Sequence, residues 1–420
     1  MMLGSSNAAV DHPTSNVTAF IRRANSIMRQ LSSATLHKFV VKFPLLRGDA
    51  DHLDRWVSLS AASRARRIVL DLCPEVEKFG DKNQMYSFPL HLFTGGSCVG
   101  GNPCVKSLYL GFVSLNLLPL AAGGSTTTSG FTNLKQLTLH KVSIVGDLQS
   151  LLPECAVLEW LSLTYCSLHC HDLIIRQPLE QLRYLRVLQC RLQKLQLQAP
   201  NLTEFEFTNQ QVPLVLGDCI NMSMASVELL LLSDDFDYIC TKLPVALPHV
   251  RDRLTVGTAI RTEALVLTKA GAVFANLRHL ILNVTIHGCP QASTGVLRLA
   301  YLLDLAPVLE ELELHMYCVS APGFPRNPRD LDAMATSPPA RLHERLRIVH
   351  MTGFHGSRGQ LELAHRILWS TAALDRLIMI IGPRIKVDYY FRNLTFADTG
   401  RLVARRYIQD QFPGTVITVL

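Results

Sequence analysis

Four residues of the types that bind metals or react as thiols stand in one short stretch of the chain. Residues 158–172 read LEWLSLTYCSLHCHD, so Cys166, His169, Cys170 and His171 fall within six positions. Structural zinc takes four imidazole or thiolate ligands, usually as two pairs with spacings such as C-x-x-C and H-x-x-x-H. No second pair follows nearby, so we expect no metal site here. A metal-binding or catalytic role for the Cys166–His171 loop is kept only as an alternative of another class.

Two glycine-rich segments resemble phosphate-binding loops at first sight. Residues 95–104, GGSCVGGNPC, lack the Lys-Ser/Thr pair that reaches phosphates and magnesium, and we predict an exposed loop. Residues 353–359, GFHGSRG, lack the G-x-G core of a dinucleotide-binding turn, and we predict a turn from a strand to a helix. Local signatures of hydrolases and metalloproteases are also missing, so we expect no enzymatic activity and no cofactor.

The stretch around Cys166 is explained better as one unit of a repeat. Its apolar positions from Leu158 onward match the leucine-rich pattern L-x-x-L-x-L-x-x-N/C-x-L, and the pattern recurs 24 residues earlier, from Leu134, and 24 residues later, from Leu182. Cys166 and Cys190 then occupy the Asn/Cys position, where a small buried polar group is expected to bond to the backbone of the turn that leaves the strand.

Looser copies of the x-L-x-L core continue in both directions. The three apolar positions of each copy are Val105-Leu108-Leu110, Leu202-Phe205-Phe207, Val227-Leu230-Leu232, Leu277-Leu280-Leu282, Leu309-Leu312-Leu314, Leu346-Val349-Met351 and Leu374-Leu377-Met379. A proline-rich loop at 321–341 lengthens one repeat, and the segment 250–275 has no assigned place among them. Repeats of this spacing predict an α/β leucine-rich-repeat solenoid, a curved parallel sheet with helical or irregular convex returns.

The flanks of the repeats predict a cap at each end. We expect a disordered N-terminus at 1–19, an N-terminal cap at 20–72 that leads into a first ladder strand at 67–72, leucine-rich repeats at 73–381, and a C-terminal cap at 382–420. Helices are predicted around residues 20–31, 52–63, 297–311, 360–376 and 398–412 from their apolar periodicity. Such caps would cover the ends of the hydrophobic core.

Composition narrows the class of partner and the compartment. The 420 residues are 48% hydrophobic with a formal net charge of +7, and the basic stretches are short and lack interleaved aromatic residues, so we expect no nucleic-acid partner. Neither an apolar leader nor a membrane span is visible, so we expect the protein in the cytoplasm or nucleus, with its eleven cysteines reduced.

The remaining candidate is a protein-binding surface on the concave face, formed by the outward side chains of the strands. Trp160 and Tyr184 on adjacent repeats, with Arg186 beside them, have the composition of a binding hot spot, although a solvated strand face also explains polar residues there. The predicted partner-binding residues are Trp160, Ser162, Tyr184, Arg186, His279, Glu311 and Glu313.

Six segments, in this order, resemble the plant F-box/leucine-rich-repeat proteins whose C-terminal region is called FBD-like. They are FIRRANSIMRQ (20–30), LHKFVVKF (36–43), LDRWVSLS (53–60), FANLRHLILNVT (274–285), APVLEELELHM (306–316) and HERLRIVHMTGFHG (343–356). The resemblance implies a receptor that recognises substrates for ubiquitination.

The F-box itself, which docks on the Skp adaptor of a cullin ubiquitin ligase in that family, has no counterpart in residues 1–19. The chain is then either a truncation or a member that carries repeats alone. We expect substrate recognition without Skp binding. The alternative is a complete F-box receptor with an unrecognised N-terminal adaptor-binding segment.

Overall fold

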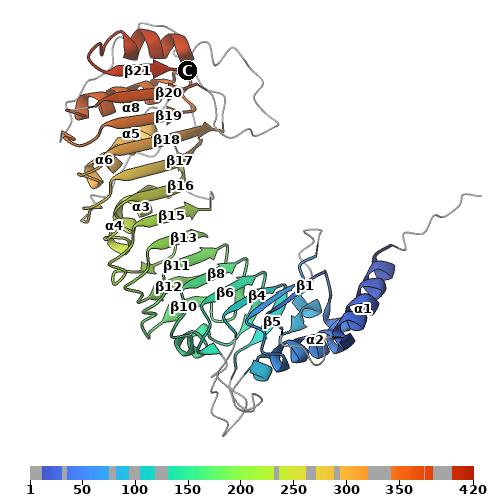
Figure 1. Ribbon diagram of the computed structural model, residues 1–420. Coiled ribbons are helices and arrows are strands. Elements are labelled where there is room, and N and C mark those ends of the chain that lie inside the picture. The colour runs from blue at the N-terminus through green and yellow to red at the C-terminus, as the bar shows by residue number, and fades with distance from the viewer. Residues whose placement is uncertain are drawn as a thin grey trace, which may run out of the picture. The chain divides into compact units, whose positions relative to one another are not determined.

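Figure 1 shows a computed structural model of the chain, which describes residues 12–30, 36–74, 82–93, 105–118, 131–230, 236–261, 271–287, 294–319, 342–372, 374–381 and 400–420. The chain divides into two compact units. The first holds residues 1–182 and 189–191, and the second holds residues 183–188 and 192–420. The predicted segments 95–104 and 321–341 lie outside the described residues.

The first unit is built on a ladder of five parallel strands. In chain order these are β1 (Lys38–Lys42), β2 (Arg67–Asp71), β4 (Ser107–Gly111), β6 (Gln136–His140) and β8 (Trp160–Thr164). The inward leucines of the repeat pattern are buried as predicted, and Leu137, Leu139, Leu161 and Leu163 are at most 1% exposed. This burial against the neighbouring rungs supplies the core that no single repeat could form.

A second, smaller ladder in the first unit follows the first at a sharp corner. Its strands are β3 (Tyr86–Ser87), β5 (Val113–Asn116), β7 (Ser143–Val145) and β9 (Ser167–Leu168), again paired in parallel. Phe112, Lys141 and Tyr165 turn the chain at the corner with positive φ angles of 53° to 56°. Non-glycine residues seldom adopt this conformation, so its repetition marks the corner as a fixed feature of each repeat.

Two helices and several short elements complete the first unit. The two longer helices are α1 (His12–Gln30) and α2 (Ala50–Ala62), and the other elements are β10 (Asp172–Ile175) and the 3₁₀ turns η1 (Arg47–Asp49), η2 (Lys82–Gln84), η3 (Leu90–Phe93), η5 (Leu148–Ser150) and η6 (Leu152–Glu154). Trp56 of α2 is buried, and its indole Nε1 donates to Asn25 Oδ1 of α1 at 2.9 Å. The Phe20 ring stacks on Phe43. The two helices therefore pack against each other beside the N-terminal strand β1.

Two boundaries of the N-terminal region differ from the sequence prediction. Helix α1 begins at His12, whereas we expected disorder up to residue 19; proline is tolerated in a first helical turn, so Pro13 does not stop the helix. The ladder begins at β1 rather than at 67–72, because β1 pairs with β2 in register along five residues. The alternation of residues 37–43 predicts this strand, but its inward residues are Phe39 and Val41, so the leucine pattern did not include it among the rungs.

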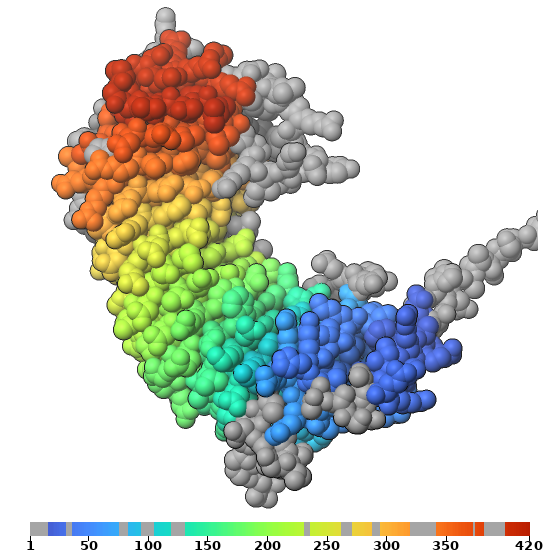
Figure 2. Space-filling view, in the orientation of Figure 1, coloured from blue at the N-terminus to red at the C-terminus, as the bar shows by residue number. Residues whose placement is uncertain are grey.

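The described part of the second unit forms one ladder of nine parallel strands. In chain order these are β11 (Tyr184–Leu188), β13 (Glu204–Asn209), β15 (Met224–Leu229), β16 (Arg253–Arg261), β17 (His279–His287), β18 (Glu311–Cys318), β19 (Ile348–Thr352), β20 (Arg376–Ile380) and β21 (Val416–Val419). Beside them, β12 (Lys194–Leu197) pairs with β14 (Leu214–Val215). The bands of the second unit in Figure 2 follow one another in chain order, so each strand contributes a neighbouring strip of surface.

Helices return the chain between the strands of the second unit. They are α3 (Phe236–Thr241), α4 (Leu243–Ala246), α5 (Thr294–Leu297), η7 (Arg298–Ala300), α6 (Tyr301–Leu305), α8 (Arg358–Ser370) and the π-helical turn η8 (Arg405–Gln409). Figure 1 shows α3, α4, α5, α6 and α8 along one side of the strands. The predicted apolar face of α8 is buried there, with Leu361, Ala364 and Leu368 at most 6% exposed.

In one part of the second unit, the predicted rung lies a few residues away from the observed strand. We predicted Val227-Leu230-Leu232 as a rung, but β15 ends at Leu229 and points Ala225 and Val227 inward. The next rung is β16, which the pattern missed because Leu254 and Val256 are followed by small residues rather than leucines. Residues 262–270, part of the segment 250–275 that had no assigned place among the repeats, lie outside the described residues.

Candidate functional site

We use the term ladder face for the outward side chains of the ladder strands. These strands are β1, β2, β4, β6 and β8 in the first unit, and β11, β13 and β15 to β21 in the second. These side chains alternate with the buried ones, so they stand on the side of the strands opposite the core. The parallel pairing is in register, which places outward residues of neighbouring strands directly opposite one another; His279, Glu311 and Ile348 form one such row.

In the first unit, the predicted contact residues Trp160 and Ser162 differ in the exposed fraction of their side chains. Trp160 stands on β8 opposite Gln136 of β6 and is 37% exposed, which is high for an indole. Ser162, two positions along the same strand, is only 4% exposed. The small serine hydroxymethyl group offers little contact surface beside its longer neighbours, whereas Trp160 offers a large apolar one.

In the second unit, Tyr184 and Arg186 both hold Glu206 of the next strand. The Tyr184 hydroxyl donates to Glu206 Oε1 at 2.7 Å, and Arg186 Nε lies 3.0 Å from Glu206 Oε2 in an ion pair. Burial and the hydrogen bond to the carboxylate raise the pKa of Tyr184 above its ordinary value. Tyr184 is 8% exposed and its hydroxyl is bonded to Glu206, so its side chain offers little surface to a partner.

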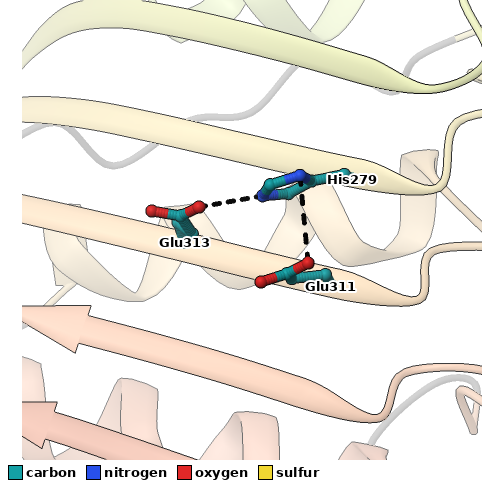
Figure 3. Close-up of side chains that lie close together, drawn as sticks. All are labelled: His279, Glu311 and Glu313. Carbon is teal, nitrogen blue, oxygen red and sulfur yellow. Dashed lines mark hydrogen bonds and ion pairs between the residues drawn. The ribbon is translucent and has the colours of Figure 1, made fainter.

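Three other predicted contact residues do come together in the second unit. His279 of β17 lies opposite Glu311 of β18 in the strand register, and Glu313 follows two positions later on β18. His279 Nε2 lies 3.1 Å from Glu313 Oε1, and His279 Nδ1 lies 3.9 Å from Glu311 Oε2. Figure 3 shows the imidazole between the two carboxylates, with the return helices behind the strands. The three side chains are between 22% and 34% exposed, so solutes can reach them.

A buried histidine fixes the far side of Glu313. His315 Nε2 lies 3.1 Å from Glu313 Oε2, and His315 Nδ1 lies 2.9 Å from the hydroxyl oxygen of Thr352 on β19. Burial opposes ionisation of Glu313, but His279 and His315 outweigh it and lower the pKa of that carboxyl below its ordinary value. Glu313 is therefore an oriented carboxylate at neutral pH.

A third histidine reaches the same group from β19. His350 stands opposite Glu313 in the strand register, and its Nε2 lies 3.8 Å from Glu311 Oε1. We call His279, Glu311, Glu313, His315 and His350 the histidine–glutamate cluster. Among the described residues, His279, Glu311 and Glu313 form the one group whose metal-ligating atoms all lie within 4.8 Å of one another.

Sequence reasoning found three members of this cluster but not their proximity. His279, Glu311 and Glu313 were predicted as separate contact residues, and His350 was not singled out. An alignment of the strands by their inward residues would have placed His279 beside Glu311, since parallel strands in register bring equivalent outward positions together. The lengths of the segments between these strands obscured that alignment.

The Cys/His stretch at 166–171 is dispersed by the fold. The Cys166 thiol is buried and donates to the Leu139 carbonyl oxygen at 3.3 Å, and the Cys190 thiol donates to the Leu163 carbonyl oxygen at 3.4 Å. Each thiol therefore bonds to the strand of the preceding repeat, and the Cys166 thiol also lies 3.6 Å from the carbonyl oxygen of Thr164, at the predicted exit of its own strand. Cys170 is exposed, and His171 Nδ1 lies 2.9 Å from the Leu168 carbonyl oxygen.

The second glycine-rich segment is the predicted turn between β19 and α8. Gly353 has a φ of 72°, and a Cβ atom placed on it would lie 1.8 Å from the Met316 carbonyl oxygen. Gln360 of α8 is fully buried, donates to the Gly353 carbonyl oxygen at 2.9 Å and accepts from the His355 amide at 2.8 Å. These contacts close the turn on protein groups and give it a structural role.

None of the described helices has the length and apolar character needed to cross a lipid bilayer.

Comparison with known sequences identifies the repeats. No curated protein sequence matches the chain. A family model described as At1g61320/AtMIF1, LRR domain, matches residues 27–417, which covers the strands of both ladders from β1 to the start of β21. Leucine-rich-repeat domains generally serve as protein-interaction modules and use their extended strand surfaces for this purpose. The chain therefore belongs to the At1g61320/AtMIF1 leucine-rich-repeat domain family.

Proposed function

We propose that the chain binds a partner protein through the ladder face and acts without covalent chemistry. The observation that supports this most directly is the strand register, which lines up outward side chains from successive repeats into continuous rows. The ladder face mixes exposed charge with apolar groups such as Trp160 and Ile380, which are 37% and 39% exposed. Specific protein interfaces commonly combine aromatic or arginine anchors with a polar surround.

Within each unit the ladder face has a different chemical character. The first unit presents Trp160 and the cations Lys38, Lys42 and Arg67. In the second unit, the carboxylates of Glu204, Glu206, Glu228, Glu311 and Glu313 stand on β13, β15 and β18. A protein partner whose contact regions carry charges opposite to those of each surface would be attracted to it, which favours rapid and specific association.

The experiment that tests this proposal maps a captured partner onto the ladder face. The full chain is used as bait, bound proteins are identified by mass spectrometry, and the affinity of the recovered partner is measured for variants. We expect Trp160→Ala or Arg186→Ala to weaken binding by about tenfold or more, as is typical of an interface anchor. The control is Val245→Ala, which removes a 61% exposed apolar side chain from α4 on the return side.

Two outcomes are possible once a partner is in hand. Loss of affinity in the ladder-face variants, with Val245→Ala unchanged, supports the proposal. Weakening by Val245→Ala with no effect of ladder-face changes places the binding surface among the return helices and overturns it.

The resemblance to F-box/leucine-rich-repeat proteins supports a narrower proposal, in which the bound partner is a substrate for ubiquitination. Increased ubiquitination of the partner when the chain is co-expressed is the expected result, and co-precipitation of the chain with the Skp adaptor would favour the alternative of a complete F-box receptor. If the partner binds while Skp binding and ubiquitination stay at background, the chain works as a binding module alone.

A further inference from the structure

The histidine–glutamate cluster has the ligand types and spacing of a transition-metal site. One imidazole and two carboxylates from two adjacent strands offer ligand atoms within 4.8 Å of one another. Hydrogen-bonded His–Glu pairs are common on protein surfaces, but here one imidazole is shared by two carboxylates, and two further histidines flank them. We propose that His279, Glu311 and Glu313 bind a zinc-class divalent ion on the ladder face of the second unit.

The spacing of the ligand atoms fits zinc with a small adjustment of one side chain. Zinc bonds nitrogen and oxygen at about 2.0–2.2 Å, which places two ligands of a tetrahedral site about 3.3 Å apart. His279 Nε2 and Glu313 Oε1 are 3.1 Å apart, close to that separation. Glu311 Oε2 lies beside the other ring nitrogen, 3.9 Å from His279 Nδ1, so the Glu311 side chain must rotate to bring an oxygen to an ion bound at Nε2; it is 34% exposed and has room to do so.

The ligand set distinguishes zinc-class ions from calcium and magnesium. Calcium and magnesium are bound mainly by oxygen, whereas imidazole favours zinc, copper, nickel and iron. Three protein ligands with an exposed side correspond to sites that keep one coordination position for water or another group. His350, with its Nε2 3.8 Å from Glu311 Oε1, offers a further nitrogen ligand for that position.

A second layer of contacts orients the site before any ion binds. Thr352 and Glu313 hold the two nitrogens of buried His315, and His315 in turn fixes the Glu313 carboxylate that faces His279. Carboxylate ligands of metal sites are usually held by such outer hydrogen bonds, and loss of an outer partner weakens metal binding by about 10- to 100-fold. A surface ion pair alone has no need of this buried support.

The test is zinc binding by the purified full chain, measured by competition with a chelating dye. We expect the wild-type chain to bind one more equivalent of Zn²⁺ than His279→Ala or Glu311→Gln. The matched control is Glu206→Gln, which removes a ladder-face carboxylate of β13 that is held by Tyr184 and Arg186 instead of by an imidazole. Calcium in excess should not displace the zinc.

Two further measurements separate the site from adventitious binding. Substitution with Co²⁺ should give a spectrum of nitrogen and oxygen ligation without sulfur-to-metal charge transfer. A charge-transfer band would instead reveal binding to free cysteines such as exposed Cys170. Thr352→Val should keep the stoichiometry and weaken the affinity about tenfold through His315. Equal zinc binding by wild type, His279→Ala and Glu311→Gln, or a thiolate spectrum that persists in all of them, overturns the proposal.

Discussion

At the scale of single residues, the cysteines show how a reactive side chain serves the repeat. Cys166 and Cys190 are buried, and each thiol donates to a carbonyl oxygen of the strand one repeat earlier. Both side chains are enclosed by the repeat core, where they pack and hydrogen-bond to the backbone. The sequence identified their place in the repeat, but the bonding partner became visible only with the strands stacked.

Replacement of Cys190 by alanine tests this role. The change removes a buried thiol together with its hydrogen bond, and we expect the free energy of unfolding to fall by about 1–2 kcal/mol. Urea unfolding followed by circular dichroism gives the measurement. Cys170→Ala, at an exposed position, should change stability by less than about 0.5 kcal/mol, and an equal loss in both variants would contradict the assignment.

His365 makes stability depend on pH. Its Nε2 bonds to the Tyr407 carbonyl oxygen at 2.6 Å, its ring stacks on Trp369, and burial lowers its pKa below the ordinary value of about 6.5. As the pH falls through about 6.5, His365 binds a proton in the unfolded chain but stays neutral in the folded chain. The free energy of unfolding therefore decreases as the pH falls.

We therefore expect the wild-type chain to lose stability between pH 7.5 and pH 5.5, and His365→Gln to lose less over the same interval. Unfolding in urea at the two pH values measures the difference. His169→Gln, in an exposed loop, should retain the wild-type dependence. His140 and His355, whose pKa values burial also lowers, account for the dependence that remains in His365→Gln.

At the scale of elements, the turn from β19 into α8 is the most restrictive connection described. Gly353→Ala would combine a strained positive φ with a Cβ atom 1.8 Å from the Met316 carbonyl oxygen, so the backbone of β18 or β19 must shift. We expect a loss of at least about 3 kcal/mol in unfolding free energy, which exceeds the usual cost of a surface substitution. Gly217→Ala, which meets no atom within 4 Å, is the control and should be close to neutral.

The elements also show which parts of the fold could be predicted. Strands with two inward leucines, such as β6 and β8, were located correctly because the pattern repeats at a constant 24 residues. The two missed rungs, β1 and β16, carry Phe39, Val41, Leu254 and Val256 at the inward positions, so the same packing is achieved without the consensus residues. Contacts between strands, including the histidine–glutamate cluster, depend on register and could not be derived from spacing within one strand.

At the scale of the whole molecule, each ladder needs its last strand to be covered. β21 pairs in parallel with β20, with Arg376 opposite Val416 and Met379 opposite Val419, and Ile417 of β21 is buried. An uncovered strand edge with an apolar core behind it is a site for aggregation. The predicted C-terminal cap therefore ends in a strand that extends the sheet, while residues 382–399 lie outside the described part.

Removal of residues 413–420 tests the importance of β21. We expect the shortened chain to aggregate at concentrations where the full chain stays monodisperse, because the paired groups of β20 become an open edge. Light scattering during storage provides the measurement. Val416→Ala, which trims a 62% exposed side chain of β21, should behave like the wild type, and an unchanged shortened chain would show that β21 is dispensable.

The in-register rows of the ladder face set a length scale for anything bound along them. Neighbouring strands lie about 4.8 Å apart, whereas one turn of an α-helix rises 5.4 Å and two residues of an extended chain rise about 6.8 Å. A helix lying across β16 to β19 would offer a side chain to every rung with a drift of only about 0.6 Å per turn. In an extended segment, the side chains on one face would shift by about 2 Å relative to the strands at every rung. These rows therefore favour helical ligands with anchors at every third or fourth residue.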